Sequence, residues 1–434
     1  MAVKQPPEKP TASSAKLRFA GDHRLKVVVL ATAEQLAAHA AAIDDLATAA
    51  VEPNVFYEPW MILPAIQAFG KTTELTFLLL YRQPPSDTPA QLCAFFPFER
   101  RSRFARLPAR ALILWQYQEC YLSTPLLRRG FETEVFRALI QWAASCPMGA
   151  DIIEGIEIGG DGPVVSSLFR SLQLLGLNSL ADWRDRPLMV PRISCDEYLR
   201  LAISGDRRRV LRSRQRNLEK LGPINFTEPQ TESTLDCWID NFLSIEASGW
   251  KGRQKVAAIC HDNTREFFRT VIHEAFRRRR LDSFTMNAGP VPVAARCSFR
   301  AGTGSFLYKS AYQEEYARYS PGALLELERI RRAHEDREIY WVDSCVSSSF
   351  DHYLPWCDRR RIADIAWSTG TLRGNLVLRV APLVRRAKAW FARRKPPVNP
   401  KGESGGAKPV NLAPEKIVEV AVNSTEKLNA RGRV

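Results

Sequence analysis

A chain of 434 residues is longer than one hydrophobic core ordinarily fills, so two domains are expected. Its hydrophobic content of 45% is typical of a globular protein, and without an 18-residue apolar run the sequence predicts no transmembrane helix. The net charge of +15 is uneven, because residues 371–434 hold 14 Lys/Arg against 4 Asp/Glu. The basic character therefore belongs mostly to a tail suited to an anionic surface, either membrane or nucleic acid.

Cysteine and histidine usage excludes two further classes of protein. The nine Cys are scattered without any CxxC pair, which favours reduced thiols in a cytoplasm over a disulfide framework. The six His are not placed at ligand spacing, so no metal site is predicted. The segment MAVKQPPEKPTASSAK has no apolar core of a secretory signal, and we expect residues 1–22 to be disordered.

The first half alternates strands with helices. Pro59 suits the first turn of a helix, and Gly70 suits the position just after its end. Strands are predicted from period-two and apolar runs, and helices from Ala-rich or amphipathic runs. The predicted strands are 25–32, 75–82, 91–100, 111–115, 151–158 and 181–190, and the predicted helices are 33–50, 59–69, 131–145 and 163–175.

The second half, which opens at Pro191, repeats this order of elements. The predicted helices are 204–221, 231–247, 263–280 and one beginning near Pro321; the predicted strands are 224–228, 281–287, 291–300, 304–310, 339–345 and 359–367, with 248–254 as a loop. The repeated order predicts two similar α/β domains in tandem, at 23–190 and 191–368.

The C-terminal tail, 369–434, lies outside this repeat. Residues 369–394 mix Leu, Val, Trp and Phe with Arg and Lys, which indicates a basic amphipathic segment that we expect Pro382 to break. Residues 395–434 are rich in Pro, Gly and Lys and are predicted to be disordered.

The stretch from Phe306 to Glu338 reads as a strand, a short loop and a helix. The junction is Arg318-Tyr319-Ser320-Pro321-Gly322-Ala323. The first amides of a helix lack partners within the helix and lie at the positive end of its dipole, so this junction is a candidate phosphate site. The alternative is a helix start with no ligand.

The run YKSAYQEEYARYSPGALLELE resembles the acyl-CoA-binding segment of the GNAT superfamily. More narrowly, it resembles the BioF2-like acetyltransferase domain of proteins called cellulose biosynthesis protein CelD. Weaker matches are 56–60 (FYEPW), 246–253 (EASGWKGR), the late strand with Asp343, and 358–361 (DRRR). The resemblance spans about 50–367. It implies two tandem GNAT-like domains, each a mixed, mostly antiparallel sheet flanked by helices, as in the Fem aminoacyltransferases, with the acyl-CoA site in the second.

The resemblance also implies which residues bind the co-substrate, acetyl-CoA or another acyl-CoA. The GNAT phosphate motif is Arg/Gln-x-x-Gly-x-Gly/Ala, and Arg318 and Ala323 match its ends. Pro321 replaces the first Gly and has no amide to donate. The expected cofactor-binding residues are Arg318, Tyr319, Ser320, Gly322 and Ala323, with amides offered by Ser320, Gly322 and Ala323.

Acyl transfer from a thioester to an amine needs a base and a donor for the developing oxyanion, without a covalent intermediate. The candidate bases are Asp343, Glu246 and Glu314. Asp343 is the first choice because an acid is out of character inside IYWVDSC. As nucleophiles, Cys297 and Cys345 are poor candidates, because such Cys are ordinarily buried apolar residues.

Four further residues are candidates for the same site. At the end of a predicted strand, Lys309 is expected to contact charge on the substrate or cofactor, and Tyr312 to donate a proton to the leaving thiolate. In the Gly-flanked loop 248–254, Trp250 and Lys251 are expected to contact the substrate as a lid. The alternatives are that Lys309 is an ordinary Lys on an edge strand, that Tyr312 is packed in the fold, and that Trp250 anchors a mobile loop.

The predicted helix 204–221 carries basic residues on nearly all faces. It is either a solvated helix or a contact for a polyanionic substrate, the CoA 3′-phosphate or nucleic acid. Nucleic acid ranks low, because no aromatic residues interleave with the charges.

These patterns lead to three hypotheses. The first is a cytoplasmic acyl-CoA-dependent N-acyltransferase acting on an amine of a sugar or lipid-linked precursor in exopolysaccharide, cellulose or envelope synthesis. In this hypothesis the tail holds the enzyme against the inner membrane. The second is a Fem-like transferase that uses aminoacyl-tRNA. The third, which Pro321 keeps open, is a catalytically degenerate GNAT scaffold in a polysaccharide synthase.

Overall fold

The computed structural model describes residues 14–16, 25–83, 90–145, 149–346 and 354–393. The predicted disordered segment 395–434 and most of 1–22 lie outside these ranges. Within the N-terminal segment that was expected to be disordered, Ser14–Lys16 forms a strand paired with the next one along the chain.

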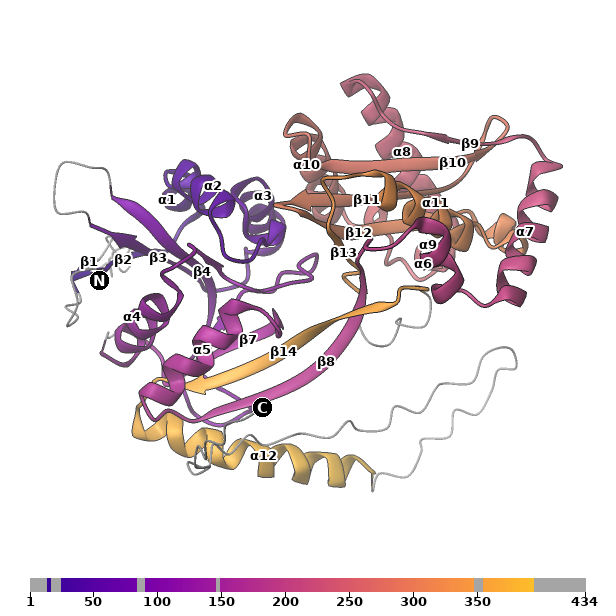
Figure 1. Ribbon diagram of the computed structural model, residues 1–434. Coiled ribbons are helices and arrows are strands. Elements are labelled where there is room, and N and C mark those ends of the chain that lie inside the picture. Colours follow the sequence, from indigo (N-terminus) through magenta and orange to yellow (C-terminus); the bar gives the residue numbers. More distant parts are fainter. Residues whose placement is uncertain (1–13, 17–24, 84–89, 146–148, 347–353, 394–434) are drawn as a thin grey trace, which may run out of the picture.

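One 14-stranded sheet runs through both halves of the chain (Figure 1). Its strands follow the order β1-β2-β3-β4-β5-β7-β14-β8-β13-β12-β11-β10-β9, with β6 paired to β4 beside this path. The bounds are β1 Ser14–Lys16, β2 Leu25–Leu30, β3 Leu75–Arg82, β4 Gln91–Arg101, β5 Ala111–Leu114, β6 Leu126–Leu127, β7 Ile152–Gly159, β8 Ser179–Met189, β9 Ile224–Thr227, β10 Leu281–Ala288, β11 Val291–Ala301, β12 Gly304–Tyr312, β13 Trp341–Asp343 and β14 Asp358–Ser368. The predicted mixed, mostly antiparallel sheet is confirmed.

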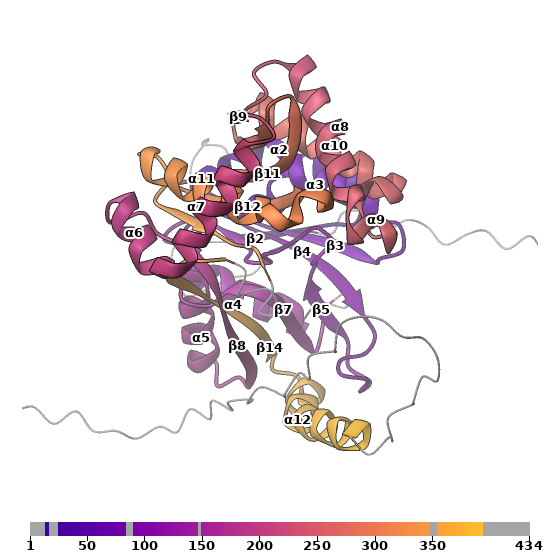
Figure 2. The same ribbon diagram turned by 90° about the vertical axis from the view of Figure 1, so that its right-hand side faces the viewer.

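Helices flank this sheet (Figure 2). The α-helices are α1 Ala33–Ala37, α2 Ala40–Thr48, α3 Pro59–Phe69, α4 Glu132–Ser145, α5 Pro163–Leu174, α6 Cys195–Ala202, α7 Gly205–Glu219, α8 Glu232–Ser248, α9 Trp250–Arg253, α10 Asp262–Arg277, α11 Pro321–Glu335 and α12 Leu372–Arg393, and the 3₁₀ turns are η1 Val55–Tyr57, η2 Ala258–Cys260 and η3 Glu314–Tyr319. The bounds predicted for α3 and β3 are confirmed to the residue.

Three helical predictions were wrong in detail. The predicted helix 33–50 is two helices, α1 and α2, and the predicted loop 248–254 contains the short α9. Helix α12 runs through Pro382 without a break. Packing outweighs the lost hydrogen bond there, because Val377, Leu378 and Ala381 are buried against the first half.

The two halves repeat one topology, as the order of predicted elements indicated. In each half an antiparallel run of four strands is followed by a helix and a strand parallel to the fourth. The first run is β2 to β5, followed by α4 and β7; the second is β9 to β12, followed by α11 and β13. Helices α1 to α3 and α8 to α10 occupy equivalent places after the first strand of each run.

Strand β14 joins the two halves into one sheet. Although the predicted boundaries assign it to the second unit, it lies between β7 and β8 of the first (Figure 1). Strand β8 then pairs with β13 at Met189 and Leu188. The last described strand therefore completes the sheet of the first half of the chain.

An aromatic core also connects the halves. The rings of Trp60 and Phe299 meet edge to face with centroids 5.4 Å apart, and those of Phe56 and Phe306 with centroids 5.8 Å apart. All four residues belong to one buried cluster that includes α3 and α10. Such ring pairs stabilise an interface beyond the area that they bury.

Replacing Trp367 on β14 tests this architecture. Trp367 is 1% exposed, so Trp367→Ala leaves a cavity where β14 packs against the first half. We expect a loss of about 3–5 kcal/mol in the free energy of unfolding, measured by urea denaturation. The matched control is Trp250→Ala, since Trp250 is 49% exposed, and it should change that free energy by about 0.5 kcal/mol or less. Equal effects of the two substitutions would contradict the placement of β14.

Candidate functional site

The candidate site begins where β12 separates from β13. These parallel strands pair only from Gly304 to Phe306, opposite Trp341 to Asp343. Beyond Phe306, no other described strand pairs with β12 on that side, although β12 runs on to Tyr312. An open strand edge presents amide and carbonyl groups that a ligand can bind.

In the equivalent opening of the first half, the chain itself binds to one of the two strands, β7. Strands β5 and β7 likewise pair over three residues, from Ala111 to Ile113. Beyond them, the Ser123 amide donates to the Glu157 carbonyl at 3.1 Å, and the Gly159 amide donates to the Thr124 hydroxyl at 2.8 Å. The chain thus occupies the β7 side of the first opening, whereas no described segment pairs with β12 in the second.

A β-bulge turns Lys309 into the interior beside this open edge. Leu307 pairs with Ser298 and Lys309 with Cys297, so Tyr308 is the extra residue. The Lys309 ammonium lies 2.9 Å from Glu119, which comes from the first half. Burial alone would lower the pKa of Lys309, but Glu119 and Glu246 outweigh burial and raise it. Lys309 is therefore a buried, charged ammonium at neutral pH.

Glu246 on α8 faces the same cluster. Its carboxylate accepts from the Lys251 ammonium at 2.8 Å and from the Ala258 amide at 2.9 Å. Burial alone would raise the pKa of Glu246, but the charges of Lys309 and Lys251 outweigh it and lower the pKa. The ammonium groups of Lys251 and Lys309 and the carboxylates of Glu119 and Glu246 thus form one charge cluster, of which only Lys251 is partly exposed.

A cavity of about 80 Å³ opens from this cluster. Its lining includes four of the predicted residues, Glu246, Trp250, Lys251 and Tyr312. Trp250 and Tyr312 are about half exposed, as expected of side chains at the mouth of a site. The structure thus brings together candidates that are more than 60 positions apart in the sequence.

Glu314, the third candidate base, also lines the cavity. It is ion-paired with Arg253 of α9, with one N–O distance of 3.0 Å. The hydrogen bond from Arg253 lowers the pKa of Glu314. This pair joins α9 to η3 at the cavity, so both carboxylates are ion-paired with α9: Glu314 with Arg253 and Glu246 with Lys251.

The predicted phosphate loop lies on the far side of Tyr312. A Cβ added to Gly322 would lie 3.5 Å from the Tyr312 ring, so the loop and the cavity adjoin. Ser320 has φ 53°, a left-handed conformation that is uncommon outside Gly. Helix α11 begins directly after it at Pro321.

Two of the three amides expected to bind phosphate are already engaged, which corrects that expectation. The Ser320 amide donates to the Ala317 carbonyl at 2.9 Å, and the Ala323 amide donates to the Ser320 carbonyl at 3.0 Å. Among the described contacts, the Gly322 amide has no acceptor. An anion at this loop can therefore bind one free amide and the positive end of the helix dipole, rather than three amides.

Two arginines supplement the loop. Arg214 of α7 donates a hydrogen bond to the Ser320 hydroxyl. Arg318 is exposed, with its guanidinium 4.7 Å from the centre of the Tyr319 ring. The position of Arg214 was not predictable from the basic pattern of its helix, because that pattern has no preferred face.

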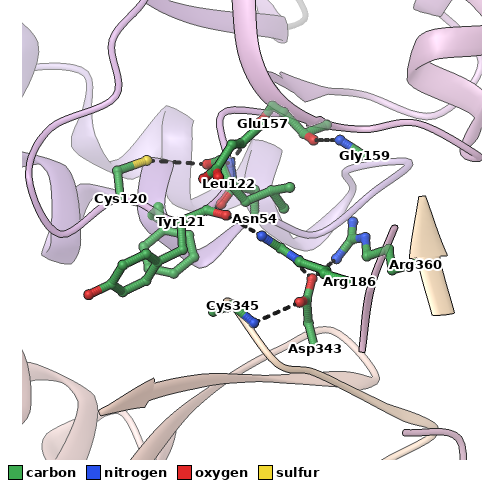
Figure 3. Close-up of polar contacts among 12 residues, drawn as sticks. Asn54, Cys120, Tyr121, Leu122, Glu157, Gly159, Arg186, Asp343, Cys345 and Arg360 are labelled. Carbon is green, nitrogen blue, oxygen red and sulfur yellow. Dashed lines mark hydrogen bonds and ion pairs between the residues drawn. The ribbon is translucent and has the colours of Figure 1, made fainter. Parts of the chain in front are cut away.

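Asp343, the first-choice base, lies at the junction of the two halves (Figure 3). Its carboxylate is fully buried and accepts from Arg186 and Arg360 at 2.6 Å each, and from the Cys345 amide at 3.0 Å. Burial alone would raise the pKa of Asp343, but the two guanidinium groups outweigh burial and lower it. A carboxylate so enclosed cannot reach a substrate, so this geometry argues against Asp343 as the base.

The junction is connected to the charge cluster through Tyr121. Arg186 also donates to the Tyr121 carbonyl at 2.7 Å (Figure 3), and the Tyr121 hydroxyl donates to Glu119 at 2.8 Å. Sequence reasoning missed Glu119, Tyr121 and Arg186. No motif marks them, since they come from the first half and meet the site only through the fold.

The remaining predictions concern thiols and metals. Burial raises the pKa of Cys297 to about 12 and that of Cys345 well above its ordinary value, so neither is a thiolate at neutral pH. Within the described ranges, no group of three or more His, Cys, Asp or Glu is arranged to hold a metal ion.

Residues 205–352 match the model of the acetyltransferase (GNAT) domain family. This segment includes the open edge of β12, the loop before α11 and Glu246. The second half therefore contains a region similar to a GNAT-type acetyltransferase domain. A comparison with curated proteins gave no match.

Several solved structures are similar to this chain over most of its length. FemX is 9% identical and aligns over 79% of this chain and 98% of its own, with a TM-score of 0.49. A conserved protein of unknown function from Bacteroides thetaiotaomicron is 12% identical over 76% and 97%, with a TM-score of 0.46. A tandem GNAT protein from the clavulanic acid biosynthesis pathway is 12% identical over 80% and 99%, with a TM-score of 0.38.

Asp343→Asn tests the structural role of the junction. We expect a loss of about 3–5 kcal/mol in the free energy of unfolding at pH 7, because two buried guanidinium groups lose their counter-charge. The lowered pKa of Asp343 stabilises the wild-type protein fully above its ordinary value of 3.8, and this contribution declines as the pH falls below 3.8. Urea denaturation at pH 7 and pH 3 should therefore show a smaller difference between variant and wild type at pH 3.

The control for this substitution is Asp185→Asn, since Asp185 is 56% exposed and 3.8 Å from Arg361. It should change the free energy of unfolding by about 1 kcal/mol or less. If Asp343→Asn left the free energy of unfolding unchanged but abolished acyl transfer, Asp343 would instead have a catalytic role.

Proposed function

We propose that the protein is an N-acyltransferase that moves an acyl group from acyl-CoA to an amine at the end of β12. The observation that carries this proposal is the open edge of β12 between the Lys309–Glu119–Glu246 cluster and the start of α11. The family match over 205–352 supports the GNAT type of chemistry.

The charges around α11 suit the phosphate end of the donor. Arg214, Arg318 and the Gly322 amide lie at the positive end of the helix dipole, where a pyrophosphate is favoured. Within the described residues, no strand pairs with β12 beyond Phe306 on the side away from β11, and its amides and carbonyls there match the amide groups of the pantetheine arm. The donor thus acts as a co-substrate held by the second half.

Two residues of the cluster suit the chemical step. Glu246 stays ionised at neutral pH and lines the cavity, so it can orient an incoming ammonium and accept its proton before attack. The buried charge of Lys309 suits stabilisation of the oxyanion that develops on the thioester carbonyl. Tyr312, at the mouth of the cavity, can protonate the leaving thiolate.

The proposed acceptor is an amine of a sugar or lipid-linked precursor. The resemblance of the YK…SPG run to CelD-like proteins supports an amine of a sugar or lipid-linked precursor in polysaccharide or envelope synthesis. The half-exposed Trp250 beside the cavity supports an acceptor with an apolar or sugar face, because aromatic rings pack on such faces.

Glu246→Gln tests the catalytic assignment. We expect kcat to fall by a factor of about 10² to 10⁴ because the base is lost. Thiol release from acetyl-CoA with a panel of amino sugars gives the rate, and calorimetry should show unchanged acetyl-CoA binding. The matched control, Glu315→Gln, removes an exposed carboxylate of η3 and should leave kcat unchanged. Full activity of Glu246→Gln would refute the assignment.

A second candidate is acyl transfer from aminoacyl-tRNA, favoured by the basic surface of α7. Arg207, Arg212 and Arg216 of this helix are exposed, and Arg214 contacts the loop before α11. A long polyanion could follow this row of charges from the site.

Calorimetry with acetyl-CoA and with charged tRNA separates these donors. For an acyl-CoA enzyme, acetyl-CoA should bind, and Arg214→Ala with Arg318→Ala should weaken it by about tenfold as charge-assisted contacts are lost. For a tRNA enzyme, only tRNA should bind, and its affinity should fall steeply with salt. Absence of binding by either ligand would favour the third hypothesis, a catalytically degenerate GNAT scaffold.

A further inference from the structure

One face of helix α12 packs against the rest of the protein. Val377, Leu378 and Ala381 are buried against residues of the first half that include Phe104 and Ile113. This contact fixes the helix on the sheet and sets which face points outward.

The outward face carries large apolar side chains. Leu372, Leu376 and Leu383 are 90%, 63% and 61% exposed. At 100° per residue these three positions lie within about 40° of one another, so they form a single stripe. Exposed leucines scattered singly need no explanation, but an aligned stripe marks an interaction surface.

The positive charge of this segment indicates an anionic binding partner. Arg373 and Arg379 are exposed on the same helix. The sequence has no acidic residue from 365 to 402, and 371–434 carries 14 Lys/Arg against 4 Asp/Glu. A stripe of leucines bordered by arginines fits the boundary between lipid headgroups and acyl chains. Nucleic acid would use the charges but not the leucines.

The position of α12 leaves this surface accessible. Both ribbon views place the helix at the outer edge of the molecule, beside β8 and β14 and away from α7 to α11 (Figures 1 and 2). No helix in the described part of the chain is long and apolar enough to cross a membrane. With Val377, Leu378 and Ala381 packed on the sheet, the stripe of leucines lies on the exposed side of α12.

We propose that α12 binds the surface of an anionic membrane through Leu372, Leu376, Leu383 and the adjacent arginines. This site is separate from the acyl-transfer site and does not depend on the proposed function.

Vesicle sedimentation of the full-length protein tests this proposal. We expect binding to vesicles of phosphatidylcholine mixed with phosphatidylglycerol, and at least about tenfold weaker binding to phosphatidylcholine alone. The variant Leu372→Ser/Leu376→Ser/Leu383→Ser should weaken binding to the anionic vesicles by at least about tenfold. Because these side chains are exposed, its melting temperature should match that of the wild type.

The matched control replaces three exposed leucines elsewhere, as Leu174→Ser/Leu175→Ser/Leu201→Ser, and should bind vesicles like the wild type. The proposal is overturned if the wild type does not bind anionic vesicles, or if both triple variants bind them equally. It is also overturned if the wild type binds a duplex RNA more tightly than the vesicles and the α12 variant retains that binding. None of these readouts depends on acyl transfer, so they leave the proposed function separately testable.

Discussion

A carboxylate buried between two guanidinium groups holds the halves of this protein in register. Asp343 comes from β13, Arg186 from β8 and Arg360 from β14, so three strands that meet where the half-sheets join share one ion cluster. Burying these charges is costly, and such a cluster contributes little net stability compared with apolar packing. Its effect is on geometry, since any slip of one strand would leave a buried charge without its partner.

The chemistry of the second half depends on that register. Arg186 fixes the Tyr121 carbonyl, and Tyr121 and Lys309 both bind Glu119, so the first half places a carboxylate inside the site of the second. The first half has kept the fold of its own equivalent opening but fills it with Ser123 and Thr124. One copy of the repeat thus supports the site, and the other contains it.

The sequence was sufficient for most of the fold, because local signals such as Pro59 at a helix start and the alternation in 75–82 act within a few residues. It also proposed Glu246, Trp250, Lys251 and Tyr312 as site residues, and the structure places these four around one cavity. The sequence-based predictions failed where contacts between distant segments determine the role of a residue or the place of a strand. In the sequence, an acid inside an apolar strand looks the same whether it acts as a catalytic base or as an ion-pair partner. Only the contacts with Arg186 and Arg360 indicate that Asp343 is an ion-pair partner. Glu119 and the insertion of β14 are likewise set by contacts between distant segments.

Hydrogen–deuterium exchange with and without acetyl-CoA tests whether the open edge of β12 binds the acyl donor, because it reports on individual backbone segments. We expect protection of 307–324, which covers the open edge of β12 and the start of α11, together with 245–253 beside the cavity. No change is expected in 122–125, the segment that lies in the equivalent opening of the first half. Protection of 122–125 instead, with 307–324 unchanged while acetyl-CoA is bound, would contradict the assignment of the site.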